Sequence, residues 1–544
     1  MVNSTPTKPL LFSALRVSAS PRSNQKKFLI LLDSRPMHDA IIIGSGFGGA
    51  LAAHALVRAR RRVLLLERGR WVERGPDNWL PGSAAQLSEH YSTATPYEVE
   101  DDAGRSTTGG FFCVGGPSVF YGGVSLRFRE QDFERSAEVA GDSGAEWPYG
   151  YAELEPYYTR VERIIGVAGT TGEDPTEPWR SAPFPQAPPP LAPVSIRIRD
   201  AARALGLHPF RLPVAINYGA EGRTTCTLCP TCDGFACAIS AKNDLATAVL
   251  PPLIREGLEV RTEAVVTRLV HDGHRISGVE YVHASTGERT TVVARQVILA
   301  AGTLATPHLL MASGLDSVTP APEALGGYLM RHCNRIVLGF FRRRPDPEGR
   351  FHKHLAIHDL YFGDPSGQGP PERLGGLQQL VTPPVSLVRA QVPRLLGPLA
   401  ALVVPQTTGL LAIAEDQPRL ENRVSLDTSR SDSFGMPVLR VRHRYTARDE
   451  AAVRTLAKTA RRVLRRAGAL AFYNHHIATF SHALGTVRMG RDPRTAPLDG
   501  ECRFRGIDNL LVVDGSALPT SAGVNPSLTI AANALRAAEA LAAR

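Results

Sequence analysis

A glycine-rich turn between two short apolar runs places the strongest constraint on the fold of this chain. The first run covers residues 38–43 and the second covers residues 63–66, with an alanine-rich segment before the second run. The turn reads G-x-G-x-x-G at Gly44, Gly46 and Gly49. Strand, glycine turn, helix and strand in this order predict the βαβ unit of a parallel sheet that binds a dinucleotide.

Each residue type in this motif has a physical task. Gly44 permits the tight turn, Gly46 lets backbone N–H groups approach a diphosphate, and Gly49 lets the helix pack closely on the strand. The helix N-terminus adds unpaired N–H donors and the positive end of its dipole. Glu67 lies 23 residues after Gly44, at the end of the second strand, where a carboxylate accepts hydrogen bonds from ribose hydroxyls.

Composition and charge exclude several classes of protein. The 544 residues are 43% hydrophobic and 21% charged, which is typical of globular proteins and too apolar for a disordered one. The formal net charge is +10, but residues 1–36 alone carry +5. A basic surface that binds nucleic acid is therefore not expected on the remaining residues.

Residues 1–36 differ from the rest of the chain. They hold three of its six lysines, and their longest apolar run, residues 28–32, is too short for a signal-peptide core or a membrane span. We predict that the functional chain starts at Met37 and that residues 1–36 are disordered or wrongly assigned to it. We expect a cytoplasmic protein without a transmembrane segment.

Two further regions carry a pattern of secondary structure. Residues 259–270, 275–283 and 290–299 alternate in the β manner and predict three strands. Residues 395–414 carry no charge, but prolines and glycines interrupt them, which a membrane-spanning helix tolerates poorly. We predict a buried helix followed by a buried strand there.

The C-terminal segment contains a second group of candidate residues. His482 precedes a Gly-Thr step, and Asp514-Gly515 follows a strand-like run. Asn525-Pro526 stands where a C-terminal alanine-rich helix should begin, with Asn525 at the N-cap position and Pro526 at the first helical position. Asn525 therefore has either a structural role, as the helix cap, or a functional one.

These motifs together resemble the glucose–methanol–choline (GMC) family of FAD-dependent oxidoreductases, over most of residues 38–544. Besides the N-terminal glycine motif and the C-terminal block, the resemblance rests on residues 115–123, 147–148 with 157–158, 301–307 with 309–310 and 313–314, and 422–424. The Gly523–Pro526 form is similar to the cholesterol oxidase branch.

The resemblance implies a fold, a cofactor and the residues that hold it. The fold is α/β: a discontinuous Rossmann-type FAD-binding domain with an α+β substrate domain built on a mostly antiparallel sheet. FAD would be bound non-covalently, since no histidine lies between His90 and His208 to link it. Many members have, near the position of Tyr121, an Asn that often contacts the flavin edge, and this chain lacks that Asn. The expected cofactor-binding residues are Gly44, Ser45, Gly46, Phe47, Gly48, Gly49, Glu67, Gly115, Gly116, Tyr121, Gly122, Val265, Asp514, Gly515, Asn525 and Pro526.

The resemblance also implies a reaction on a small-molecule alcohol. His482 would take the hydroxyl proton as general base while the carbon gives hydride to flavin N5, and Asn525 would hold the alcohol oxygen. A helix N-terminus directed at the flavin would stabilise negative charge on the reduced ring. The alternative on the same scaffold is a non-redox lyase. The substrate itself, whether alcohol, polyol or sterol-like, carries no recognisable motif.

Four of the seven cysteines cluster at Cys226, Cys229, Cys232 and Cys237. The spacing suits an iron–sulfur cluster or zinc, and structural thiols, reduced or paired in disulfides, explain it equally well. A cluster would indicate a dehydrogenase that passes electrons to a protein or quinone acceptor. Without one, dioxygen remains an acceptor.

The predicted domains follow from the positions of these motifs. After the leader (1–36), the FAD-binding domain takes residues 37–180, 220–320 with the cysteines, and 481–544 with His482 and Asn525. The substrate domain takes residues 181–219 and 321–480.

Overall fold

A five-stranded parallel sheet forms the core of one half of the protein. The computed structural model describes residues 38–102, 104–363, 373–477 and 479–544, so the leader of residues 1–36 lies outside the described residues. The strand order is β18-β10-β1-β2-β6, and every neighbouring pair is parallel. The strands are β1 (His38–Ile43), β2 (Val63–Leu66), β6 (Glu259–Arg261), β10 (Ala294–Leu299) and β18 (Leu510–Val512).

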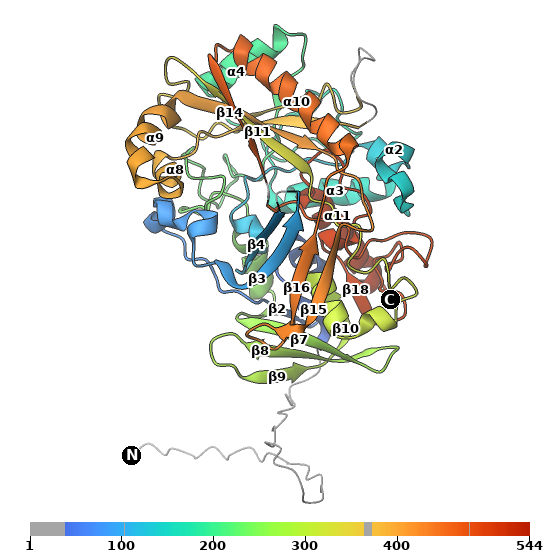
Figure 1. Cartoon of the computed structure of the whole chain (residues 1–544). Coiled ribbons are helices and arrows are strands. Elements are labelled where there is room, and N and C mark those ends of the chain that lie inside the picture. Colours follow the sequence, from blue (N-terminus) through green and yellow to red (C-terminus); the bar gives the residue numbers. More distant parts are fainter. Residues whose placement is uncertain (1–37, 103, 364–372, 478) are drawn as a thin grey trace, which may run out of the picture.

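Helices from both ends of the chain cover this sheet. α1 (Phe47–Arg58) packs against α11 (Ser527–Ala542), and α11 also packs against α3 (Tyr151–Ile165). The apolar residues of β1 and β2 are almost fully buried because helices and loops cover both faces of a parallel sheet. Figure 1 places this half, with both the first and the last strand of the chain, in the lower part of the molecule.

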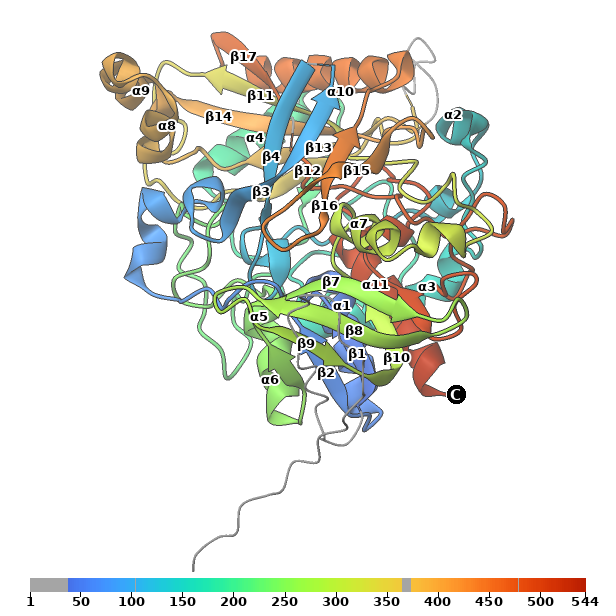
Figure 2. The same ribbon diagram turned by 60° about the horizontal axis from the view of Figure 1, so that its bottom comes forward.

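A small antiparallel sheet lies beside the parallel one and corrects one strand prediction. Its strands are β7 (Ala264–His271), β8 (Ile276–His283) and β9 (Arg289–Val292), which lie at the front of Figure 2. The run predicted as one strand, 259–270, divides at Glu263, whose φ of 55° breaks the extended backbone. Its first part joins the parallel sheet as β6 and its second part forms β7. The run 290–299 divides in the same way between β9 and β10.

A six-stranded antiparallel sheet forms the other half of the molecule. Its order is β17-β11-β14-β13-β12-β5. α10 (Ala447–Arg466) packs across it and also contacts α4 (Pro193–Arg203), at the top of Figure 1. The strands are β5 (Phe210–Arg211), β11 (Cys333–Phe340), β12 (Leu355–Ile357), β13 (Gly375–Leu380), β14 (Thr407–Ala414) and β17 (Ala471–His476). A Rossmann-type sheet combined with a mostly antiparallel one confirms the predicted fold class.

A four-stranded sheet connects the two halves. Its strands are β3 (Tyr91–Asp101), β4 (Gly104–Phe111), β15 (Arg423–Ser431) and β16 (Pro437–Arg442), with β16 parallel to β3 and the other pairs antiparallel. Shorter α-helices join the layers: α2 (Ala137–Ala140), α5 (Leu245–Ala248), α6 (Leu250–Arg255), α7 (Ala305–Ala312), α8 (Val385–Gln391) and α9 (Gly397–Val403).

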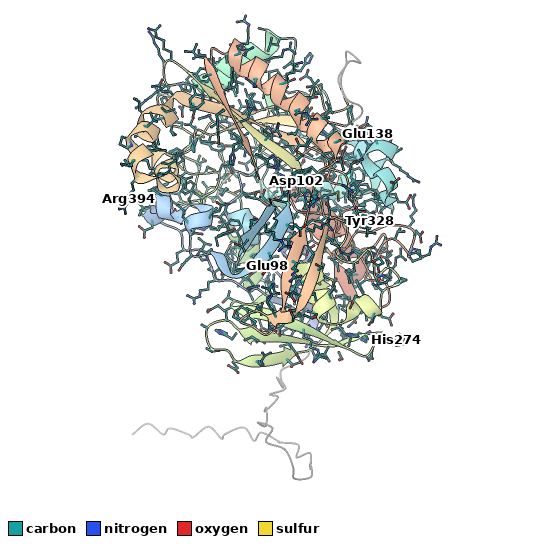
Figure 3. All side chains as sticks on the ribbon, in the orientation of Figure 1. Glu98, Asp102, Glu138, His274, Tyr328 and Arg394 are labelled. Atoms are coloured by element: carbon teal, nitrogen blue, oxygen red, sulfur yellow. The ribbon has the colours of Figure 1, made fainter. Side chains whose placement is uncertain are left out.

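The uncharged run 395–414 is buried over only half of its length. All eight residues of β14 are buried, as predicted. The helical half, α9 with the turn before it, exposes its leucines instead, with Leu395 94% exposed. It lies at the outer edge of the molecule, beside Arg394 (Figure 3). The prediction of a buried helix was therefore wrong, because lack of charge alone does not indicate burial. In the described ranges, no helix combines the length and the apolarity that crossing a bilayer requires.

Candidate functional site

The N-terminal glycine motif lies at the carboxyl end of β1, where α1 begins. Gly44 has a φ of 96°, a backbone conformation that favours glycine. A Cβ on Gly49 would lie 1.9 Å from the Gly44 carbonyl oxygen, so only glycine lets α1 pack this close to the turn. Phe47 and Gly48 form the first residues of α1, and Gly46 is its N-cap.

The N-terminus of α1 is open toward a ligand. No side chain caps it, and its first turn carries no acidic residue. A Cβ on Gly46 would meet nothing within 4 Å, so free space borders the turn. Unpaired N–H groups, a positive dipole end and space for close approach fit a diphosphate.

Glu67 is fixed beside this turn at the end of β2. The side chain is 7% exposed, and one carboxylate oxygen accepts hydrogen bonds from the Ser45 backbone N–H (3.0 Å) and hydroxyl (2.5 Å). The other oxygen accepts from the Gly69 N–H at 2.9 Å. Burial raises the pKa of Glu67, and these hydrogen bonds oppose that rise. Val265 lies one residue beyond Ala264, whose N–H donates to the Glu67 carbonyl.

A second glycine turn packs onto the first. The Gly115 N–H donates to the Ser45 hydroxyl at 2.9 Å. A Cβ on Gly116 would lie 3.4 Å from the Gly46 Cα, so the two turns face each other. We call Gly44–Gly49, Glu67 and Gly115–Gly116 together the cofactor cradle, after the role that we propose for them below.

The remaining residues of the second glycine segment lie farther along. The Tyr121 ring lies 5.6 Å from the Phe47 ring, centre to centre, and its hydroxyl donates to the Asn243 carbonyl at 3.1 Å. Gly122 lies against the ion pair of Lys353 and Asp233. The Tyr121 hydroxyl is thus already engaged with the protein backbone.

Asp514 joins the end of β18 to the loop after β10. One carboxylate oxygen accepts from the Gly302 N–H (2.9 Å) and the Thr306 hydroxyl (2.5 Å). A Cβ on Gly515 would lie 2.9 Å from Leu484, so glycine allows the segment that carries His482 to approach. The carboxyl ends of β1, β10 and β18 therefore converge, as ligand sites of such sheets require.

The structure brings His482 and Asn525 together. The Asn525 Nδ2 lies 3.2 Å from the His482 Nε2, although the residues are 43 positions apart. α11 begins at Ser527 and its N-cap is Pro526, one residue later than predicted, and Asn525 caps nothing. The Asn525 side chain instead turns toward His482, which removes its purely structural explanation.

Two further side chains, which the sequence did not indicate, contact this pair. The Gln378 Nε2 on β13 donates to the Asn525 Oδ1 at 2.6 Å. The His332 Nδ1, just before β11, lies 2.9 Å from the His482 Nδ1. We call His332, Gln378, His482 and Asn525 the catalytic cluster, after the role that we propose for them below. The one available signal was two adjacent amides, Gln378-Gln379, in an otherwise apolar stretch.

The catalytic cluster favours uncharged imidazoles. Burial lowers the pKa of His482 well below the ordinary value of 6.5, and the charges of His332 and Lys353 add to this effect. Burial also lowers the pKa of His332, which is 0% exposed. The His482 residue as a whole is partly buried.

The four clustered cysteines do not fit a metal site. All four are free thiols, and burial raises the pKa of Cys226 to about 11. The Leu228 N–H donates to the Cys226 sulfur, and the Ala241 N–H donates to the Cys237 sulfur. Within the described ranges, no three His, Cys, Asp or Glu side chains are arranged to hold a metal ion. The iron–sulfur and zinc alternatives thus lack a donor set, and reduced structural thiols fit.

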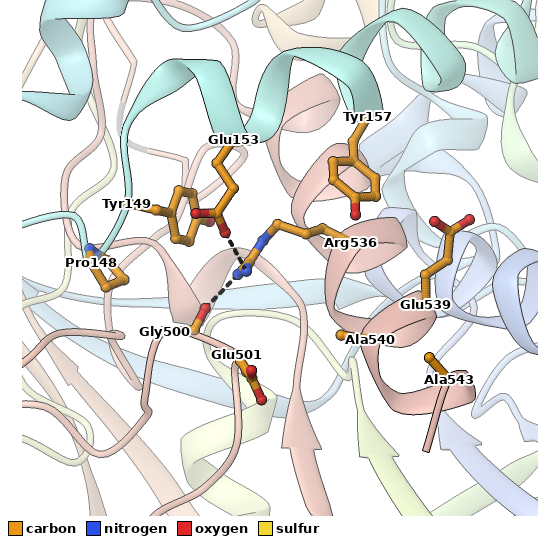
Figure 4. A pocket seen from close by; sticks show the side chains of 10 residues that line it. All are labelled: Pro148, Tyr149, Glu153, Tyr157, Gly500, Glu501, Arg536, Glu539, Ala540 and Ala543. Atoms are coloured by element: carbon orange, nitrogen blue, oxygen red, sulfur yellow. Dashed lines mark hydrogen bonds and ion pairs between the residues drawn. The ribbon is translucent and has the colours of Figure 1, made fainter.

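A surface hollow of about 670 Å³ lies between α3 and α11, away from these residues (Figure 4). Arg536 crosses it, bonded to Glu153 (3.0 Å) and to the Gly500 carbonyl (2.6 Å). None of the residues of the cofactor cradle or the catalytic cluster lines it.

Comparisons with known proteins agree with this arrangement. Two family models, both described as GMC oxidoreductase, match residues 39–334 and 418–534. The chain is 32% identical to the paromamine 6'-oxidase of Streptomyces fradiae, covering 94% of this chain and 92% of that protein. It is 28% identical to the 2-methyl-1,2-propanediol dehydrogenase of Mycolicibacterium austroafricanum, and the match covers 93% of this chain and 95% of that protein.

A solved structure has the same fold. The pyridoxine 4-oxidase from Mesorbium loti superposes with a TM-score of 0.65 at 22% identity, covering 93% of this chain and 99% of that one. The family models cover both the cofactor cradle and most of the catalytic cluster. The chain therefore belongs to the GMC oxidoreductases, flavoproteins that oxidise alcohol groups.

Proposed function

We propose that this protein oxidises a CH–OH group of a small polar molecule, with non-covalently bound FAD as the cofactor and His482 as the general base. The observation that carries this proposal is the 3.2 Å approach of His482 and Asn525. Relatives named for paromamine, 2-methyl-1,2-propanediol and pyridoxine suggest a small hydroxyl-bearing substrate.

The cofactor cradle would hold the dinucleotide part of FAD. The N-terminus of α1 and the turn at Gly46 would bind the diphosphate, and Glu67 would accept from the ribose hydroxyls. Asp514, Gly515 and Pro526 lie on the segments that meet His482, so they would face the isoalloxazine ring. FAD, when bound there, would accept the hydride from the alcohol carbon.

The catalytic cluster would handle the proton of the alcohol. The Asn525 N–H would donate to the alcohol oxygen, and the His482 Nε2 would accept the hydroxyl proton as the carbonyl forms. Imidazole is too weak a base to ionise a free alcohol, so proton removal must accompany hydride loss. Such assistance contributes about 10²–10⁴-fold to the rate.

Anaerobic mixing of the purified protein with a panel of alcohols tests the proposal. The panel should include the three molecules named above and cholesterol as the sterol representative. We expect a flavin absorbance spectrum that at least one small polar alcohol bleaches. A protein without flavin, or a bound flavin that no alcohol bleaches, would contradict the proposal.

Reoxidation of the bleached flavin then identifies the electron acceptor. Reoxidation in air with release of hydrogen peroxide identifies an oxidase. Reoxidation by an artificial dye alone identifies a dehydrogenase with a redox partner.

A further inference from the structure

The ring of His332 touches both the catalytic base and the loop that carries Asn525. Its Nε2 lies 3.0 Å from the Ser521 carbonyl oxygen and 2.9 Å from the Ala522 carbonyl oxygen. Its Nδ1 lies 2.9 Å from the His482 Nδ1. The two rings are nearly perpendicular, at 87°.

The chemistry of these partners determines where the hydrogens are. Carbonyl oxygens only accept hydrogen bonds, so the His332 Nε2 must carry a hydrogen. A neutral imidazole has one donor and one acceptor, which makes the His332 Nδ1 an acceptor. The hydrogen between the two rings then belongs to the His482 Nδ1, and the His482 Nε2 is left with its lone pair.

We propose that His332 is a positioning residue that holds His482 in the tautomer with hydrogen on Nδ1, so that Nε2 is always available to accept the substrate proton. The inference rests on the proposed function, because it assigns His482 its reacting atom. It goes further in naming how the protein selects that atom.

The contacts on the other side of His482 agree with this assignment. The Gln378 Nε2 donates to the Asn525 Oδ1, which leaves the Asn525 Nδ2 as a donor directed at His482. A donor there requires an acceptor on the His482 Nε2. In the opposite tautomer, two donors would face each other at Asn525 and two acceptors would face each other at His332.

The position of His332 is itself fixed by the fold. Its backbone N–H donates to the Asp416 carboxylate at 3.1 Å, and the Tyr445 hydroxyl donates to its carbonyl at 2.8 Å. The same carboxylate accepts from the Ser521 hydroxyl at 2.9 Å. Asp416 therefore sets the distance between His332 and the carbonyl groups that orient its ring. The φ of 59° at His332, unusual for a residue with a side chain, accords with a constrained functional position.

Two isosteric substitutions separate the two contacts of His332. His332→Asn places an amide oxygen at the position of Nδ1, so it still accepts from His482, but it cannot reach the Ser521 and Ala522 carbonyls. His332→Gln reaches those carbonyls but offers no acceptor at the Nδ1 position. We expect His332→Gln to slow substrate-dependent flavin reduction by about 10- to 100-fold, the size of loss seen when the orienting partner of a metal-binding histidine is removed. His332→Asn should retain most of the rate, and KM should change little in both variants.

Nitrogen NMR of the resting holoenzyme, labelled with ¹⁵N-histidine, measures the tautomer directly and without substrate. His482→Gln identifies the His482 signals among the 16 histidines. We expect hydrogen on Nδ1 of His482 in the native protein and in His332→Asn, and a mixture of both tautomers in His332→Gln, where only the Asn525 contact still favours Nδ1. Melting temperature and FAD content verify that the variants fold.

Two results would overturn the inference: hydrogen on Nε2 of His482 in the native protein, or an unchanged tautomer in His332→Gln. If neither variant folds, the native spectrum still decides. If no alcohol bleaches the flavin, the proposed function fails, while the tautomer result stands on its own.

Discussion

Gly44 to Gly49 contribute mainly backbone groups to the cofactor cradle, whereas each member of the catalytic cluster contributes a side-chain hydrogen bond. The cradle lies largely within one βαβ unit, with Gly115–Gly116 packed on it. The cluster draws on four separate segments: one before β11, β13, the loop before Gly485 and the start of α11. A site built from backbone requires glycines at fixed spacing, and a site built from distant side chains requires only that the fold bring them together.

The largest expected effect concerns the cradle. Gly49→Val should abolish FAD binding, because a Cβ there meets the Gly44 carbonyl oxygen at 1.9 Å. Overpacking of this kind costs about 1–3 kcal/mol, sometimes more, so the melting temperature should also fall. Flavin absorbance after gel filtration and thermal unfolding measure the two effects.

Gly46→Ala is the matched control for that substitution. Its Cβ meets no protein atom within 4 Å, so the protein should fold normally. The methyl group would instead occupy the space beside the N-terminus of α1, and FAD affinity should fall without loss of melting temperature. Full FAD occupancy in Gly49→Val would refute the assignment of the cradle.

The second effect concerns the catalytic cluster. His482→Ala should leave FAD bound and slow flavin reduction by about 10²–10⁴-fold, the usual contribution of a general base. Stopped-flow absorbance measures it. His475→Ala, on the exposed β17, is the control and should reduce at the native rate. Equal rates in His482→Ala and the native protein would remove His482 from the mechanism.

The sequence predicted the cofactor cradle better than the catalytic cluster, because the cradle is local in sequence and the cluster is not. Gly44, Gly49 and Glu67 were identified because the turn, the close packing and the buried carboxylate leave local signatures. They predicted the βαβ unit, and the resemblance to the GMC family implied the whole fold class, which is confirmed. The pairing of His482 with His332 had no such signature, because it spans 150 positions and depends on where two sheets meet.

The misassigned features have local physical causes. The start of α11 was placed one residue early because Asn525 is a good N-cap type, yet its side chain is bound to Gln378. The helix α9 was expected to be buried because its segment lacks charge, but Leu395 and its neighbours face outward. At both places the residue type predicted the environment wrongly, and only the contacts in the structure show it.

A third, smaller effect tests the donor role of Asn525. Asn525→Ala should slow flavin reduction by about 2- to 13-fold, which corresponds to loss of one hydrogen bond of about 0.5–1.5 kcal/mol. Asn525→Asp keeps the shape but replaces the N–H donor with an acceptor, so it should be no faster than Asn525→Ala. Native rates in Asn525→Asp would show that the donor is not needed. FAD content should stay unchanged in both variants, in contrast to the cradle variants.

The smallest effect is a shift in the pH dependence of the native protein. His482 can accept a proton only while it is neutral, and that fraction falls as the pH drops through its pKa. Because burial holds this pKa well below 6.5, the rate of flavin reduction should stay constant from pH 6.5 upward and decline only at lower pH. Anaerobic stopped-flow measurements across the acid range would locate the decline. The cofactor cradle contains no histidine, so FAD content should not follow the same curve. A decline centred at or above pH 6.5 would mean that His482 titrates as an exposed histidine and that the buried hydrogen-bonded arrangement of the cluster does not persist in the working enzyme.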